Sequence, residues 1–203
     1  GLGDVYKRQD IQGITAHPMS SKGQLLNPIL VAHDFIGMLD RGQTPEFTEK
    51  TEGFVWVNGI QGGPAKCRVS LKLRDHSLKR YEEKKTLIRA IVDCLRVRYP
   101  RAKINLTIED VYGNIADAIK PENSACIDML RRAMEIEHVT VKDIAMRGGT
   151  DGSFISTQGI PTPNYFTGAH NFHSACEFMP MSSWLKSLAV TLRLVELAAG
   201  VTK

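Results

Sequence analysis

Residues 146–178 combine a Gly-rich turn with a His-rich loop. The turn is RGGTDG at residues 147–152, PNYFTG follows at 163–168, and the loop is HNFHSACE at 170–177. A Gly-rich turn can present backbone N–H groups to an anion, and histidines near a carboxylate can bind a metal ion. Together these motifs favour hydrolytic metal chemistry.

The order and spacing of these motifs resemble the carboxyl-terminal segment of the peptidase T family. These are zinc aminotripeptidases within the large superfamily of aminoacylase- and carboxypeptidase-like metallopeptidases. The resemblance covers roughly residues 11–199. It implies an active site with two zinc ions, whose other ligands lie upstream in a His-x-Asp segment and a Glu-Glu pair. We therefore expect the chain to be a fragment that supplies one ligand and is inactive alone.

The resemblance places His173 at the position of a zinc ligand. Considered alone, such a histidine is more often a surface-loop residue that makes a backbone hydrogen bond. His170 stands where the family commonly has a tyrosine, so it is a conceivable rival ligand. Glu177 is expected to orient the site and not to bind metal.

His17, in the segment AHPMSSKG at residues 16–23, matches the family's lid histidine. That histidine reaches the active site of the neighbouring subunit and stabilises the tetrahedral oxyanion. The alternative is a loop residue that precedes a helix capped by Ser20 or Ser21.

Two arginines are candidates for binding the carboxylate of a small peptide substrate. Arg74 lies on the polar face of an alternating strand, and Arg147 precedes the Gly-Gly-Thr turn. A guanidinium binds a carboxylate through paired hydrogen bonds. A cross-strand ion pair is an equally good explanation of Arg74. Thr150 positions the turn or touches substrate, whereas Asp151 could satisfy N–H groups of its own turn.

The composition is that of a globular protein. The chain has 203 residues, of which 42% are hydrophobic and 24% charged, and no apolar run approaches the roughly 18 residues of a membrane span. Four widely spaced cysteines argue against a disulfide framework and favour a reducing cytoplasm. We expect a cytoplasmic protein that binds neither membrane nor nucleic acid and forms a homodimer through its lid domain.

A nucleic-acid-binding module is the alternative from a different functional class. The formal net charge is +4, and the basic excess lies in the first part of the chain. A ferredoxin-like domain that binds RNA needs aromatic residues on its central strands. Residues 65–74 have none, which argues against this alternative. Within the family, the alternative is another peptidase or amidohydrolase.

Hydrophobic periodicity predicts six elements in the first part of the chain. Residues 65–74 alternate strictly, as an antiparallel strand with one wet face does. The full prediction is a strand at 10–16, a helix at 20–39, strands at 54–57 and 65–74 around a turn at 59–64, a helix at 76–99 and a strand at 103–109. This order is the ferredoxin-like βαββαβ arrangement, here an α+β lid domain.

The remaining residues are expected to form the C-terminal part of an α/β catalytic domain. The pattern predicts helices at 121–137, from 154 to 159 and at 181–199, and strands at 139–144 and 164–166. The expected domains are 10–114 for the lid and 115–203 for the catalytic part. Residues 4–9, DVYKRQ, are identical to a translated sequencing-library adaptor, so residues 1–9 are expected to be non-native; the alternative is an ordinary disordered terminus.

Overall fold

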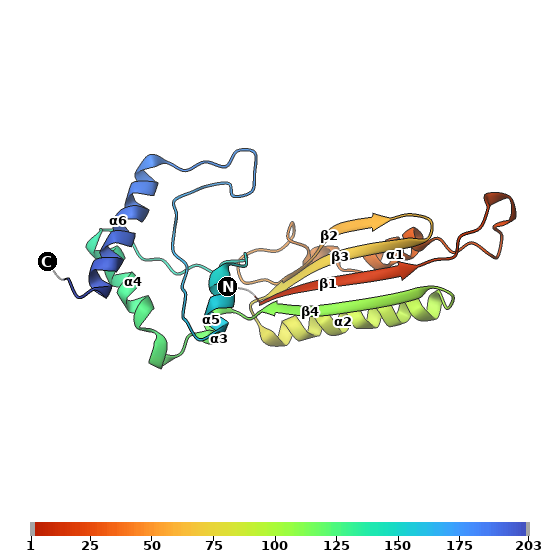
Figure 1. The fold of residues 1–203 in the computed structure, drawn as a ribbon, viewed down its shortest axis with the longest axis horizontal. Helices are drawn as coiled ribbons and strands as arrows, with labels where there is room; N and C mark the ends of the chain where they lie inside the picture. Colours follow the sequence, from red (N-terminus) through yellow and green to blue (C-terminus); the bar gives the residue numbers. More distant parts are fainter. Residues whose placement is uncertain (1–2, 202–203) are drawn as a thin grey trace. The chain divides into compact units, whose positions relative to one another are not determined.

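The computed structural model describes residues 3–201 (Figure 1), which divide into two compact units. Unit 1 comprises Gly1–Asn114 together with Ala145–Gly149, and unit 2 comprises Ile115–Ile144 and Thr150–Lys203. Among the described residues, no helix is both long and apolar enough to cross a membrane.

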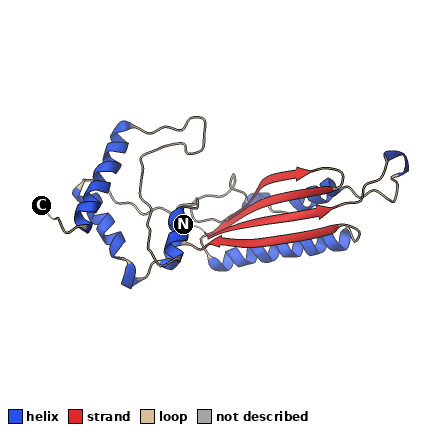
Figure 2. Ribbon diagram, viewed as in Figure 1, coloured by secondary structure: helices blue, strands red, loops and turns tan. Residues whose placement is uncertain are grey.

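Unit 1 is an antiparallel four-stranded sheet with two helices on one face (Figure 2). The strand order is β2-β3-β1-β4, and each of the two helices connects strands that have one other strand between them. The elements are β1 (Gly3–Gln12), α1 (Pro28–Gly37), β2 (Phe54–Gly62), β3 (Lys66–Asp75), α2 (Leu78–Arg98) and β4 (Lys103–Tyr112). The predicted βαββαβ order is therefore confirmed.

Strand β3 shows why this sheet has one dry face. Its side chains alternate between buried and partly exposed along the strand, and every second one enters the core beneath α1 and α2. The buried set is Cys67, Val69, Leu71 and Leu73, each at most 2% exposed. A shift of one residue would turn this whole set toward water, so the register is strongly specified.

Helix α1 begins later than predicted. Pro28 is the first residue of the helix, where a backbone N–H would have no partner within the helix. The Asn27 side chain caps the helix by accepting a hydrogen bond from the N–H of Ile29 at 3.0 Å. Leu26 cannot join the helix because it exchanges two backbone hydrogen bonds with Ile14, each 2.9 Å long. The prediction of a helix from residue 20 was wrong because it followed apolar spacing and overlooked this cap.

Two further boundaries differ from the predictions. Strand β2 continues to Gly62, through the segment predicted to be a turn, and a register shift between Val57 and Gly59 accommodates the extra residue. Helix α2 begins after Ser77, whose hydroxyl accepts from the N–H of Arg80. Leu78, in the first turn of α2, is 71% exposed.

Strand β1 starts at Gly3, not at residue 10, and runs between β3 and β4. Gln9 pairs with Val69 in the register and is fully buried. Neither its amide nitrogen nor its amide oxygen has a hydrogen-bond partner. A buried amide without partners destabilises a core, so Gln9 is a poor residue for this position. The adaptor origin of residues 1–9 stays a prediction.

Replacing Gln9 by leucine is expected to stabilise unit 1 by about 1–3 kcal/mol, because the substitution removes an unsatisfied amide and adds apolar contact. Urea unfolding of the parent and the Gln9→Leu variant measures the difference. Gln12→Leu, at the exposed end of the same strand, is the matched control and is expected to stay within about 0.5 kcal/mol of the parent. Equal stability of Gln9→Leu and parent would contradict the assignment of Gln9 to the core.

Unit 2 is helical, with α3 (Ile115–Ala118), α4 (Ala125–Ile136), α5 (Asp151–Thr157) and α6 (Met181–Ala198). Its core joins α4 to α6 through Leu130, Ala133 and Val190, with Tyr165 and Phe166 packed against them. The long C-terminal helix is confirmed, while α5 begins at Asp151 and not at residue 154.

Residues 139–144 and 164–166 were predicted to be strands, and that prediction was wrong. Both segments lack strand pairing; all four strands of the described chain belong to the sheet of unit 1. A strand requires a neighbour for its backbone hydrogen bonds, which an apolar pattern alone does not provide.

Candidate functional site

His17 lies in a loop that follows β1 and projects past the end of the strands (Figure 1). It occupies the N-cap position of a short 3-10 helix, Pro18–Ser20. Its Nδ1 accepts a hydrogen bond from the N–H of Met19 at 3.2 Å. Because Nδ1 is an acceptor, a neutral ring carries its proton on Nε2. The exposed ring can therefore donate a hydrogen bond outward while its orientation is fixed by the loop.

Arg74 and Arg147, far apart in the sequence, lie together in unit 1. An Nη1 hydrogen of Arg74 is donated to the carbonyl oxygen of Arg147 at 3.1 Å. The guanidinium of Arg147 is itself held, because it donates to both the backbone oxygen and the hydroxyl of Thr48. It also lies over the ring of Phe54, 5.0 Å from the centroid.

Thr48 was not predicted as a partner of Arg147. It lies in a polar loop, and nothing in the local pattern shows that residue 147 returns to it. His76 was not predicted either; it lies one residue beyond the end of β3, two residues after Arg74. Burial lowers the pKa of His76 below its ordinary value, and the charge of Arg147 acts in the same direction. A neutral imidazole therefore accompanies the two arginines.

His17 and Arg74 lie at opposite ends of the same sheet. In the register Arg74 pairs with Asp4 near the beginning of β1, whereas His17 follows Gln12 at its other end. At a rise of 3.3 Å per residue the strand keeps the two residues about 30 Å apart. One subunit therefore cannot bring His17 to its own Arg74–Arg147 pair.

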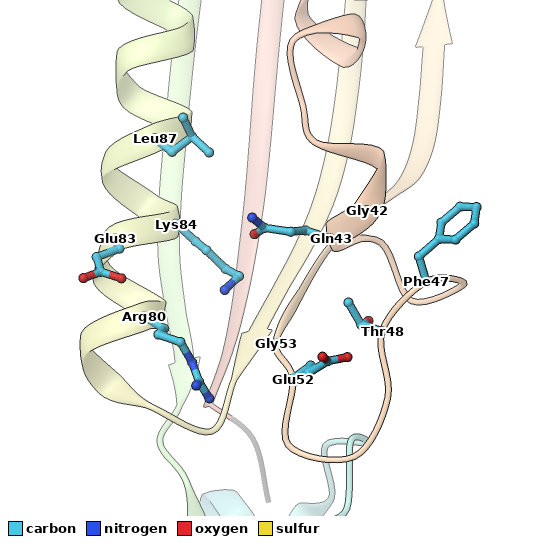
Figure 3. A pocket seen from close by; sticks show the side chains of 10 residues that line it. All are labelled: Gly42, Gln43, Phe47, Thr48, Glu52, Gly53, Arg80, Glu83, Lys84 and Leu87. Atoms are coloured by element: carbon cyan, nitrogen blue, oxygen red, sulfur yellow. The ribbon is translucent and has the colours of Figure 1, made fainter.

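A pocket opens between residues 42–53 and helix α2 in unit 1 (Figure 3). Arg80 and Lys84 extend from α2 into it and hold the buried carboxylate of Asp75, at 3.1 and 2.7 Å. Gly53 lines the same pocket and has no room for a Cβ, which would overlap the Asp75 carboxylate. Thr48 connects this pocket to Arg147, but none of the predicted site residues lines it.

Burial alone would raise the pKa of Asp75. The ammonium of Lys84, the N–H of Ser77 and the guanidinium of Arg80 more than offset this effect and hold the pKa below its ordinary value. Asp75 is therefore an ionised, structural carboxylate that anchors the start of α2 to the end of β3.

In unit 2, Thr150 is the residue before helix α5. Its hydroxyl makes no capping bond to the helix but accepts from the side-chain amide of Asn164 at 3.0 Å. Gly152 lies so close to the backbone oxygen of Thr162 that a Cβ there would be 2.6 Å from it. Residues 150–152 are thus packed directly against residues 162–164.

His173 lies at the tip of a closed loop. The loop's base is a pair of backbone hydrogen bonds between His170 and Phe178, and Glu177 accepts from the backbone N–H of His173 at 2.9 Å. Asn171 and His173 have φ values of 56° and 64°, in the left-handed region that few side chains adopt. Glu177 therefore fixes the backbone that presents the His173 ring.

His170 has a different environment from His173. Its ring stacks on Phe178, with centroids 5.1 Å apart and an interplanar angle of 18°. This stacking ties the His170 ring to the base of the loop, although both histidine residues are exposed.

The donor set of the described chain does not fit a complete dizinc centre. No group of three or more His, Cys, Asp or Glu side chains that could hold a metal ion occurs within residues 3–201. A catalytic zinc ion usually has three protein ligands. His173, whose backbone is held by Glu177, could supply one ligand to such a centre.

Residues 6–103, most of unit 1, match the peptidase dimerisation domain family. The chain is 46% identical over 182 residues to a peptidase T-like protein of Yersinia pestis, covering 90% of this chain and 44% of that protein. It is 38% identical over 189 residues to peptidase T of Halothermothrix orenii, covering 93% of this chain and 46% of that protein. The chain thus spans about half the length of these curated relatives.

A solved structure gives the same result for the fold. The crystal structure of a tripeptidase from Staphylococcus aureus superposes with a TM-score of 0.73 over 98% of this chain and 52% of that chain, at 21% identity. Residues 6–103 thus match the peptidase dimerisation domain family, and over nine-tenths of its length the chain is similar to proteins named peptidase T or peptidase T-like.

Proposed function

We propose that this chain forms about half of a zinc-dependent aminopeptidase that releases the N-terminal residue from tripeptides. The supporting observation is its identity of 34–46% to proteins named peptidase T or peptidase T-like, over at least 90% of its own length. In this proposal the complete enzyme is cytoplasmic and holds two zinc ions. His173 supplies one ligand, and the remaining ligands come from residues outside this chain.

Arg74, Arg147 and Thr150 are the proposed substrate-binding residues. A tripeptide has a carboxylate only a short distance from its first peptide bond. Two guanidinium groups at a fixed distance from that bond would bind the carboxylate and so select peptides of this length. The contacts of Arg147 with Thr48 and Phe54 restrict its guanidinium to one orientation. We assign both guanidinium groups a contact with the carboxylate, and the hydrogen bond from Arg74 to the carbonyl oxygen of Arg147 holds the two residues together.

His17 is the proposed catalytic residue that acts on the site of a second subunit. The separation of about 30 Å along β1 excludes a contact with its own Arg74, so this role requires a homodimer. The match of residues 6–103 to a dimerisation domain supports that assembly. A proton on Nε2 makes the ring a donor to the negative charge that develops on the scissile carbonyl oxygen.

The test joins this chain to the part of the Yersinia pestis relative that lies outside the matched region. We expect zinc-dependent release of the N-terminal residue from tripeptides, with loss of activity on chelation and recovery on adding zinc. The unjoined chain is expected to show no turnover, with or without zinc. Faster hydrolysis of an N-carbamoyl amino acid than of a tripeptide would favour the amidohydrolase alternative, and chelator-sensitive turnover by the unjoined chain would contradict the proposal.

A further inference from the structure

Residues 13–27 form the loop that carries His17, which we call the His17 loop. Its base is closed by two backbone hydrogen bonds between Ile14 and Leu26, each 2.9 Å long. Beyond this base, residues 15–25 are largely exposed. An exposed loop has little buried surface to hold it in one conformation, so the direction of the His17 ring depends on individual hydrogen bonds.

Arg101 reaches the His17 loop from the turn between α2 and β4, which lies at the same end of unit 1 (Figure 1). Its Nη1 donates to the carbonyl oxygens of Gly23 at 3.1 Å and Gln24 at 3.4 Å. Gly23 has a φ of 73°, a left-handed conformation that glycine adopts without strain. Within residues 3–201, no other hydrogen bond joins residues 15–25 to the rest of the chain.

The turn that carries Arg101 is itself fixed. The backbone N–H of Tyr99 donates to the carbonyl oxygen of Leu95 at 2.8 Å, and that of Ala102 returns to the carbonyl oxygen of Tyr99 at 2.9 Å. The Tyr99 hydroxyl also donates to the carboxylate of Asp34 on α1. Because these bonds tie the turn to both helices, Arg101 extends from a rigid base.

Hydrogen bonds within the loop connect the contact of Arg101 to His17. The N–H of Gln24 donates to the carbonyl oxygen of Ser21 at 2.9 Å, and the Ser21 hydroxyl donates to the carbonyl oxygen of Pro18 at 3.2 Å. Pro18 directly follows His17 and begins the 3-10 helix that His17 caps. A constraint at Gln24 is therefore passed through Ser21 to the turn that orients the His17 ring.

We infer that Arg101 is a positioning residue, which anchors the His17 loop and so sets where the His17 ring lies in the site of the second subunit. The inference rests on the proposed function of His17. A donor to the developing oxyanion acts at a separation of about 2.7–3.1 Å, so a small displacement of the ring removes much of its effect. A loop that projects from one subunit to another requires a fixed attachment to its own subunit, and Arg101 provides it.

Two other roles of Arg101 predict different results. If its side chain contacted the partner subunit, its loss would weaken the dimer. If it acted only through its positive charge, removal of a nearby cation would have the same effect. Lys103 is an exposed cation two residues further on, at the start of β4, and Lys103→Ala is the matched control for charge.

The first test measures the kinetics of the joined enzyme. Arg101→Ala is expected to lower kcat about tenfold with KM within about twofold of the parent, whereas Lys103→Ala should leave both within about twofold. Arg101→Lys keeps a donor of similar reach and should recover part of the loss. In the His17→Ala background, Arg101→Ala should change kcat by less than about twofold, because the group that it positions is absent. Additive losses would overturn the inference.

Limited proteolysis of the chain alone gives a readout that does not depend on activity. Lys22 lies in the His17 loop beside Gly23, so a lysine-specific protease is expected to cut after Lys22 several-fold faster in Arg101→Ala than in the parent. Mass spectrometry identifies the cut, and urea unfolding checks that unit 1 keeps its stability. The Lys103→Ala variant should be cut after Lys22 at the parental rate. Equal rates for Arg101→Ala and parent would overturn the inference.

Mixed dimers show in which subunit Arg101 acts. When Arg101→Ala is mixed with a variant that lacks His173, one site keeps its own His173 and receives His17 from a subunit with an intact Arg101. Activity should therefore rise several-fold above the mean of the two separate preparations. No rise, although labelled subunits exchange, would overturn the inference, and so would a monomeric Arg101→Ala variant in light scattering.

The variants also separate the failure of this inference from that of the proposed function. If His17→Ala leaves kcat unchanged, the proposed role of His17 is wrong and the inference fails with it. If His17→Ala lowers kcat and Arg101→Ala does not, the inference alone is wrong.

Discussion

Replacing His17 by alanine in the joined enzyme is expected to lower kcat by a factor on the order of 10² while leaving KM within a few-fold. The hydrogen bond from Nε2 would strengthen only as charge develops on the carbonyl oxygen, so its loss affects the transition state and not substrate binding. Zinc content should remain unchanged, which metal analysis checks. A residue that only caps the 3-10 helix would instead lower stability and leave kcat nearly at the parental value.

Mixing two inactive variants tests whether His17 acts between subunits. One partner carries His17→Ala and the other lacks the proposed ligand His173. In a mixed dimer one site combines both defects and the other combines neither, so activity should return. A control with the same two substitutions in one chain keeps both sites defective. No recovery, although labelled subunits exchange, would rule out action in trans.

Replacing Asp75 by asparagine is expected to destabilise unit 1 by about 3–5 kcal/mol. The side chain of Asp75 is fully buried, and that of Lys84 is only 12% exposed, so the substitution leaves an ammonium without its counter-charge in a nearly dry position. Urea unfolding measures the loss. Asp93→Asn removes an exposed ion pair with Arg96 on the same helix and is the matched control, expected to cost less than about 1 kcal/mol. Equal effects would show that burial does not strengthen the Asp75 cluster.

The same cluster predicts a pH dependence. The folded-state pKa of Asp75 lies below its ordinary value of 3.8. Its contribution to stability is therefore complete above that value and is lost as the pH falls through the lower folded-state pKa. The stability difference between parent and Asp75→Asn should be constant at neutral pH and shrink in strong acid. A difference that grows on acidification would contradict the assignment of an ionised Asp75.

The strict alternation of apolar and polar residues in β3 made the sheet predictable. The element boundaries that were predicted wrongly depend on local hydrogen bonds and helix caps. Cys67 to Leu73 alternate without interruption, so the strand and its dry face followed from the sequence. Apolar spacing extended α1 too far, because the cap at Asn27 and the backbone bonds of Leu26 outweigh it. Residues 139–144 have the composition of a strand, but pairing depends on a neighbour that no local pattern can reveal.

The candidate site was predictable as residue types and not as an arrangement. The resemblance selected Arg74 and Arg147 separately, whereas their contact and the role of Thr48 arise from the return of residues 145–149 to unit 1. The same limit applies to Glu177. Its sequence position suggested an orienting role, and the contact with the His173 backbone supplies a structural basis that spacing alone could not identify.

The position of β1 in the sheet has a consequence for the order in which unit 1 forms. Gln12 in β1 pairs with Lys66 of β3 on one side and with Lys103 of β4 on the other. The central strand β1 therefore needs two partner strands that are encoded much later in the chain. Such non-local pairing gives a high contact order, which slows folding. During synthesis α1 and the β2–β3 hairpin can form before β4 is made, and β1 can pair with β3 on one side only. Until β4 has left the ribosome at least one edge of β1 remains open to pairing with other chains, so expression at low temperature with slow synthesis should favour the native sheet over aggregation.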